Sequence, residues 1–386
     1  MKLEFIYSGC DGVGFGPVDE GDNRSLLIEN MEGSRKLRAL DLFAGAGGFS
    51  LAAQRSGIDV VAAVELNAHA CATYKHNIVI DGLPSLYNND ILELEPEVIK
   101  SKHFFAPNEC DIILGGPPCQ GFSVHRIKNS GVNDPRNELV LRYFEYVKYL
   151  KPKIFLMENV PGILWPRHEF FLNALYAEAK KSGYNVLEPV IIDARNYGVP
   201  QRRRRVFILG VREDVSLNIE WPPRPTHGSP TDLEKNRDLE PWVKSENVFS
   251  LSLSDDDENN RHMNHSKELI EVFKRTPING SRKDSGRVLR CHAKHDGHKD
   301  VYGRINLKEP GPTMTTACIN PSKGRFVHPV ENHGITMRHA ARFQTFPESF
   351  VFKGGLIAGG AQIGNAVPVM LGEALLTSIA SALREN

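Results

Sequence analysis

Apolar and polar positions along the first half of the chain predict short strands separated by helices. Short apolar runs that end at glycine, proline or acidic residues predict strands at residues 39–43, 58–64, 86–87, 111–114, 154–157, 186–193 and 206–210. Stretches with one apolar face predict helices at residues 49–53, 67–77, 136–150 and 169–181. Strands alternating with helices are typical of an α/β protein with a doubly wound, mostly parallel sheet.

The pattern becomes irregular after residue 212. Residues 221–241 are rich in proline, and only short helices are predicted, at residues 267–274 and 336–343, before a long apolar helix at residues 368–383. We therefore expect four parts along the chain. They are an N-terminal arm at residues 1–36, a first domain at 37–212, a smaller irregular domain at 213–353, and a C-terminal segment at 354–386 that returns to the first domain.

Composition limits the kinds of surface and the cellular compartment that we expect for the protein. Its 47 lysines and arginines balance 47 aspartates and glutamates, so any nucleic-acid surface must be local. Six cysteines without paired spacing favour a reducing compartment. No run of 18 apolar residues predicts a membrane span, and the first residues, MKLEF, do not resemble a secretory signal. We expect a cytoplasmic protein, or a nuclear one in a eukaryotic host.

A glycine-rich turn predicts a ligand site at the end of the first strand. Gly45, Gly47 and Gly48 would let the backbone approach a ligand, and Glu65 at the end of the next strand suits two ribose hydroxyls. Sites for NAD, FAD and S-adenosylmethionine share this layout, and the glycines could also serve close packing alone. Asp90 is a candidate partner for adenine, although an aspartate in a loop is often a turn former.

Three polar features follow successive strands. Cys119 stands on a stiff loop of glycines and prolines, where a cysteine is either a nucleophile or a structural thiol. Glu158 ends a buried strand, which is costly unless the carboxylate is paired or used. Arg203 and Arg205 alternate into a strand and should share one face, as in an anion clamp, unless they belong to a plain basic surface.

Together these residues resemble the ordered motifs of the DNA (cytosine-5)-methyltransferases, of the bacterial and phage restriction-modification type. The motifs are residues 41–50 (DLFAGAGGFS), 116–123 (GPPCQGFS), 157–162 (MENVPG), 201–205 (QRRRR), 336–347 (TMRHAARFQTFP) and 364–368 (GNAVP). Six motifs in one order are far more specific than any single motif. The resemblance implies a Rossmann-like S-adenosylmethionine-dependent catalytic domain at residues 37–212 and a target-recognition domain at 213–353.

The resemblance also implies a role for each site residue. Cys119 would add to carbon 6 of cytosine, Glu158 would hydrogen-bond the ring at N3 and the amino group, and Arg205, with Arg203, would hold the base O2 and the flanking phosphate. The implied S-adenosylmethionine pocket consists of Phe43, Gly45, Gly47, Gly48, Glu65, Leu66, Asp90, Ile91, Pro118, Leu139, Asn365 and Val367. The family often has an aromatic residue at the position where this chain has Leu66.

The implied substrate is cytosine in duplex DNA, which must leave the base stack before its ring can be attacked. Residues 120–134 would form a mobile loop that closes over the DNA, and residues 275–326 would recognise the target, with the threonine-bearing stretch 311–316 among them. Cys291, His292, His295 and His298 lack the paired spacing of a zinc site, and the family chemistry needs no metal. We expect a monomer, with any cognate restriction endonuclease acting separately.

Three alternatives differ in substrate or class. A tRNA cytosine-5 methyltransferase would share the chemistry, but that branch departs after the catalytic Pro-Cys-Gln, where this chain has Gly121-Phe-Ser123. A catalytically silent DNA-binding regulator would not need Cys119, Glu158 and Arg205 together. An NAD-linked oxidoreductase would use only the glycine-rich turn.

Overall fold

The computed structural model describes residues 35–104, 106, 109–118, 137–287 and 300–385. The chain divides into two units, Met1–Lys36 and Leu37–Asn386, and all the described strands and helices belong to the second unit. The boundaries expected near residues 212 and 353 remain predictions.

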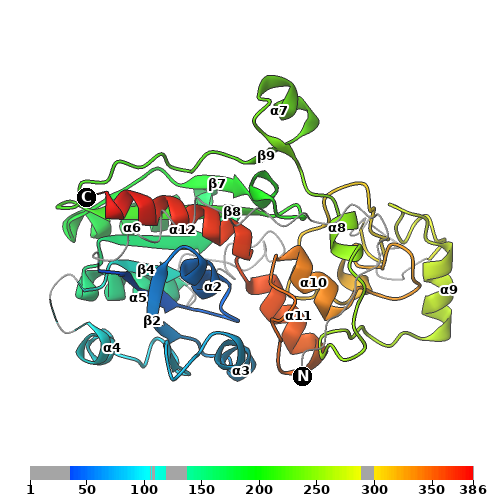
Figure 1. Ribbon diagram of the computed structural model, residues 1–386, viewed down its shortest axis with the longest axis horizontal. Helices are drawn as coiled ribbons and strands as arrows, with labels where there is room; N and C mark the ends of the chain where they lie inside the picture. The colour runs from blue at the N-terminus through cyan, green and yellow to red at the C-terminus, as the bar shows by residue number, and fades with distance from the viewer. Residues whose placement is uncertain (1–34, 105, 107–108, 119–136, 288–299, 386) are drawn as a thin grey trace, which may run out of the picture. The chain divides into compact units, whose positions relative to one another are not determined.

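A central sheet of eight strands organises the described part of the unit (Figure 1). Its order is β3-β2-β1-β4-β5-β8-β6, with β7 also paired to β8. The strands are β1 (Leu37–Leu42), β2 (Ile58–Val64), β3 (Ser85–Tyr87), β4 (Ile112–Gly115), β5 (Ile154–Asn159), β6 (Tyr184–Val186), β7 (Val190–Asp193) and β8 (Arg204–Arg212). The five strands β3, β2, β1, β4 and β5 run parallel to one another, whereas β8 runs antiparallel to β5, β6 and β7. The sheet is thus mostly parallel, which confirms the predicted fold class.

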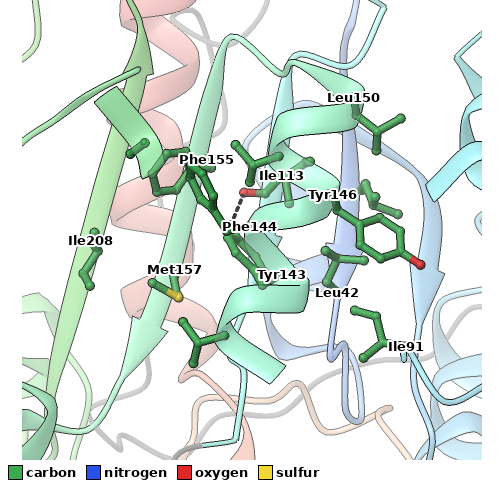
Figure 2. Packing of buried hydrophobic residues seen from close by; sticks show 14 of the residues in the cluster. Leu42, Ile91, Ile113, Tyr143, Phe144, Tyr146, Leu150, Phe155, Met157 and Ile208 are labelled. Atoms are coloured by element: carbon green, nitrogen blue, oxygen red, sulfur yellow. Dashed lines mark hydrogen bonds between the residues drawn. The ribbon is translucent and has the colours of Figure 1, made fainter. Parts of the chain in front are cut away.

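Helices cover both faces of this sheet because its strands are apolar on both sides. The helices associated with it are α2 (Gly48–Arg55), α3 (Ala68–Asn77), α4 (Pro96–His103), α5 (Asn137–Leu150), α6 (Glu169–Lys181) and α12 (Val369–Arg384). On one face, Ile113 and Phe155 pack with α5 and α6, and Tyr143 of α5 donates a hydrogen bond to the carbonyl oxygen of Ile113 (3.0 Å; Figure 2). On the other face, Ile112 and Ile154 pack with α2 and α12.

The C-terminal helix α12 lies against α2, next to the N-terminal strands of the sheet (Figure 1). Gly355–Arg384, which contains α11 (Gly355–Asn365) and α12, is the one described stretch that is apolar and long enough to cross a membrane. Because 67% of an apolar 18-residue window within that stretch is buried inside the protein, the stretch has the character of core helices.

The segment between β8 and α11 is mostly irregular. Among its described residues, the regular elements are β9 (His227–Gly228), α7 (Pro230–Lys235), β10 (Glu240–Pro241), α8 (Glu246–Phe249), α9 (Lys267–Arg275), a 3-10 helix (Pro321–Lys323) and α10 (Met337–Phe343). All seven residues of α10 are buried, and α10 packs against α8 and α11 in a separate apolar cluster (Figure 1). Helix α10 is therefore the centre around which this irregular region is built.

Two local expectations need correction. The single strand expected at residues 186–193 is two strands, β6 and β7, because Pro189 between them has no N–H for a sheet hydrogen bond. Helix α11 was not expected, since its sequence contains several glycines that disfavour helices. Close packing explains the glycines of α11. For example, a Cβ at Gly359 would lie 2.3 Å from Sδ of Met337, so a larger residue there would clash.

Candidate active site

A cavity of about 1090 Å³ lies at the carboxyl ends of the parallel strands. Its lining includes Asp41 in β1, Glu65 after β2, Gly116 after β4 and Glu158 near the end of β5. Crevices at this edge are the usual ligand sites of open α/β sheets. Eleven of the twelve predicted cofactor residues line the cavity, and Gly47 is the one that does not.

The glycine-rich turn between β1 and α2 forms one wall. Gly47 caps α2 in a left-handed conformation (φ 96°), and a Cβ there would lie 2.0 Å from Cδ1 of Ile78. A Cβ at Gly48 would lie 2.6 Å from the carbonyl oxygen of Val367. These two glycines therefore allow the turn to pack closely between α3 and the chain that links α11 to α12.

Glu65 lines the cavity beside the glycine-rich turn. Its Oε2 accepts a hydrogen bond from the N–H of Gly45 (2.8 Å), and Oε1 accepts one from the N–H of Asn67 (2.7 Å). Next to it, the side chain of Leu66 is 63% exposed although it is apolar. A carboxylate held in place beside an exposed apolar surface suits a ligand with vicinal hydroxyls and a flat ring.

Asp41 is a buried acid that was not predicted as a site residue. Its Oδ2 accepts a hydrogen bond from Oγ of Ser50 (2.6 Å), which lies 2.7 Å from the hydroxyl of Tyr74. Burial raises the pKa of Asp41 to about 7, opposed by the Ser50 hydrogen bond and reinforced by the negative charge of Glu65. The available signal was an acid within a buried strand directly before the glycine-rich turn.

Glu158 and Arg205 meet inside the cavity. Nε of Arg205 in β8 lies 2.8 Å from Oε1 of Glu158, and both side chains are largely buried. Oε1 is buried and makes no aligned hydrogen bond in the described structure, so its interaction with Arg205 is a charge contact. Glu158 could have been buried only as the partner of an arginine in a structural ion pair. The ion pair with Arg205 exists, but both of its residues line the cavity.

The loop after β4 passes directly beside this pair. A Cβ at Gly116 would lie 3.3 Å from Oε2 of Glu158, and Nδ2 of Asn159 donates a hydrogen bond to the carbonyl oxygen of Pro117 (3.4 Å). Pro118 also lines the cavity. Cys119 and residues 120–134 lie outside the described residues, and the description of the loop ends one residue before the cysteine.

Arg203 lies just before β8 and lines the same cavity. Its two Nη atoms donate hydrogen bonds to backbone carbonyl oxygens, and its Nε has no partner among the described residues. Arg203 and Arg205 therefore both reach the cavity, but they have different surroundings. The lining also includes side chains that were not predicted as site residues, namely Thr313, Thr315, Thr316, Ala358, Ala361 and Gln362.

Metal ligands were considered at Cys291, His292, His295 and His298, all of which lie outside the described residues. Among the residues that are described, no group of three or more histidine, cysteine, aspartate or glutamate side chains could hold a metal ion.

Comparison with known proteins agrees with this geometry. Residues 37–381 match the family model described as C-5 cytosine-specific DNA methylase. The chain is 30% identical over 349 residues to the Type II methyltransferase M1.HphI of Haemophilus parahaemolyticus, covering 89% of this chain and 86% of the relative. It is also 30% identical over 380 residues to the Type II methyltransferase M.DdeI of Desulfomicrobium norvegicum, covering 89% and 88%.

A solved structure has the same fold. A prophage-encoded protein of E. coli, described as a DNA modification methyltransferase, superposes with a TM-score of 0.69 at 26% identity, over 90% of this chain and 100% of that chain.

Proposed function

Because the chain belongs to the C-5 cytosine-specific DNA methylase family, we propose that Cys119 attacks carbon 6 of a cytosine turned out of duplex DNA, beside a bound S-adenosylmethionine. Membership of the family makes the protein a DNA (cytosine-5)-methyltransferase. The observation that supports the detailed proposal is the Glu158–Arg205 pair, which shares one cavity with the glycine-rich turn and borders the loop that leads to Cys119.

The cofactor end of the cavity fits S-adenosylmethionine. The carboxylate of Glu65 would hold the ribose hydroxyls, Leu66 and Ile91 would contact adenine, and Asp90 would accept from its amino group. Phe43, Gly45, Gly48, Pro118, Leu139, Asn365 and Val367 would complete the pocket, with Gly47 supporting the turn from behind. S-adenosylmethionine, when bound, supplies the electrophilic methyl group that carbon 5 takes up.

The protein's own residues make carbon 5 reactive. The thiolate of Cys119 forms a bond to carbon 6, which turns the ring into an enamine whose carbon 5 is nucleophilic. Glu158, whose Oε1 is paired with Arg205, would accept a hydrogen bond from the amino group through its carboxylate and would hold the ring at N3 as charge develops. Arg205 would orient Glu158 and hold O2 of the base. Loss of the carbon 5 proton and departure of the cysteine then release 5-methylcytosine.

The proposed setting follows from the substrate and the relatives. A base inside a duplex is inaccessible, so the target must leave the stack before Cys119 can reach it. The relatives named above are Type II methyltransferases, and this supports a role beside a separate restriction endonuclease. We infer that the chain acts as a monomer in the cytoplasm, and that its second domain reads the DNA sequence.

A covalent trapping experiment tests the role of Cys119. In DNA made with 5-fluorocytosine, carbon 5 carries fluorine in place of the proton that must leave, so the adduct should persist. The wild-type protein with S-adenosylmethionine should form a complex with this DNA that survives denaturation, whereas Cys119→Ser should form none. A wild-type protein that methylates ordinary DNA but forms no complex would contradict the covalent mechanism.

A further inference from the structure

Arg203 joins two segments that lie far apart in the sequence. Its Nη1 donates to the carbonyl oxygens of Met314 and Gly364 (3.1 Å each), and its Nη2 donates to those of Gly364 (3.1 Å) and Ala366 (2.9 Å). Met314 belongs to the threonine stretch, residues 311–316, whereas Gly364 and Ala366 lie at the end of α11. One side chain therefore connects both segments to the start of β8.

Two glutamines strengthen the same junction. Nε2 of Gln201 donates to the carbonyl oxygen of Phe343 and to Oε1 of Gln344 (2.6 Å each), while its Oε1 accepts from the N–H of Met314 (2.9 Å). Nε2 of Gln344 in turn donates to the carbonyl oxygen of Ala366 (3.0 Å). Both glutamine side chains are fully buried, so these hydrogen bonds are shielded from water.

The backbones of the two segments also touch. A Cβ at Gly364 would lie 2.2 Å from the carbonyl carbon and oxygen of Thr315, and 2.3 Å from the amide nitrogen of Thr316. Only glycine permits this approach. On the other side, the N–H of Gly311 donates to the carbonyl oxygen of Pro200 (2.8 Å). The threonine stretch is thus held between the start of β8 and the end of α11.

Both connected segments line the cavity at different places. Thr313, Thr315 and Thr316 come from the threonine stretch, and Asn365 and Val367 come from the predicted cofactor pocket. Burial lowers the pKa of the Arg203 guanidinium well below its usual value, and the nearby charge of Arg205 lowers it further. Apolar residues could hold a core together at less cost, whereas the planar guanidinium fixes several carbonyls in direction as well as distance.

We propose that Arg203 is a positioning residue that couples the threonine stretch to the cofactor end of the cavity, so that cofactor binding further restrains residues 311–316. The inference rests on the proposed function, because the ligand that starts the coupling is the cofactor. It assigns Arg203 a role distinct from that of Arg205, which is paired with Glu158.

Hydrogen exchange of the full-length chain, with and without S-adenosylhomocysteine, tests the coupling. In the wild-type protein the ligand should slow amide exchange in residues 311–318 about fivefold or more, the lower end of ordinary coupling between sites. Arg203→Lys keeps the positive charge but replaces the planar fork by a single ammonium group. This variant should bind the ligand in a calorimetric titration yet lose the protection of residues 311–318.

The matched control is Arg204→Lys, the same substitution at an exposed neighbour, which should behave like the wild-type protein. Should Arg203→Lys fail to fold, Gly364→Ala replaces it, since its Cβ would push the two segments apart and remove the same protection. The coupling would be overturned if the ligand slowed amide exchange in residues 311–318 of Arg203→Lys as much as in the wild-type protein. It would also be overturned if the wild-type protein bound the ligand without any such slowing. Absence of binding by the wild-type protein would overturn the proposed function, and the titration shows which has failed.

Discussion

At the scale of single residues, the cavity contains buried charges whose positions the strands determine. Glu158 lies near the end of β5, and Arg205 lies in the antiparallel neighbour β8, two residues from the partner Phe207 that faces Glu158 in the register. Their proximity could be predicted from the sequence as two strand ends at one edge. The hydrogen bonds of Arg203 could not be predicted from the sequence, because its carbonyl partners lie more than 100 residues away along the chain.

Replacing Glu158 by glutamine should disable catalysis while preserving the fold. The glutamine side chain would keep the shape but lose the charge that pairs with Arg205 and holds the ring, so the methylation rate at saturating DNA should fall about 10²–10³-fold. Single-turnover methylation measures this rate. The control Glu234→Gln removes an exposed carboxylate on α7 and should have the wild-type rate. A Glu158→Gln rate within a factor of about two of wild type would remove Glu158 from the mechanism.

Asp41 should make the stability of the protein depend on pH. Its pKa is raised from 3.8 to about 7 in the folded protein, so between these values the folded state binds a proton that the unfolded chain does not. The contribution of Asp41 to the free energy of unfolding is greatest below pH 3.8 and is lost as the pH rises to about 7. This change amounts to about 4 kcal/mol, at about 1.36 kcal/mol per pKa unit. Asp41→Asn cannot titrate and should not show this loss.

Urea unfolding at pH 5 and pH 8 measures the effect. The wild-type protein should lose stability relative to Asp41→Asn over this interval, whereas the control Asp255→Asn, at an exposed position, should follow the wild-type protein. Parallel pH dependence of the wild-type protein and Asp41→Asn would show that Asp41 is ionised throughout.

At the scale of elements, hydrophobic periodicity predicted most strands and helices of the sheet region. β2 and α6 have the predicted ends, since turn residues bound both elements. The antiparallel direction of β8 was not predicted, because a strand buried on both faces has the same apolar pattern in either direction. In the irregular region, long-range contacts to α10 determine the structure, and local sequence patterns do not encode them.

A cluster of histidines around α10 should make this region sensitive to acid. His262 stacks on His333 with ring centroids 3.9 Å apart, and His328 lies near both His333 and His339, at 5.2 and 5.1 Å. Burial, together with the charges of Arg304 and neighbouring histidines, lowers the pKa of His328 from 6.5 to about 4. The stability from its neutral form is therefore present above pH 6.5 and is lost as the pH falls toward 4.

Substitution of His328 by glutamine tests this expectation. Glutamine can still accept a hydrogen bond from the N–H of Glu331, as Nδ1 of His328 does (2.9 Å), but it cannot take up a proton. The melting temperature of His328→Gln should fall less between pH 7 and pH 5 than that of the wild-type protein. His76→Gln, at an exposed position on α3, is the control and should not change the slope. Equal slopes for all three proteins would show that folding does not lower the pKa of His328.

At the scale of the whole molecule, the chain places the proposed cofactor pocket, the Glu158–Arg205 pair and the threonine stretch around one cavity. The formal net charge is zero, so attraction to DNA must come from local basic surface rather than from the protein as a whole. Within the expected target-recognition region, residues 275–304 contain eight lysines and arginines against three aspartates. We expect the basic surface there, although residues 288–299 lie outside the described part of the chain. The motif series predicted the family and the cavity, whereas recognition of a DNA sequence depends on contacts that no motif specifies.

Base-resolution mapping of 5-methylcytosine tests both the methylation reaction and the role of Cys119. The DNA would come from a methylation-free host that expresses the wild-type chain or Cys119→Ser, both verified as soluble protein. We predict that the wild-type chain methylates carbon 5 of cytosine within one short sequence and that Cys119→Ser leaves every such site unmodified. Unmethylated DNA with soluble wild-type protein, or methylation by Cys119→Ser at the wild-type level, would contradict the account.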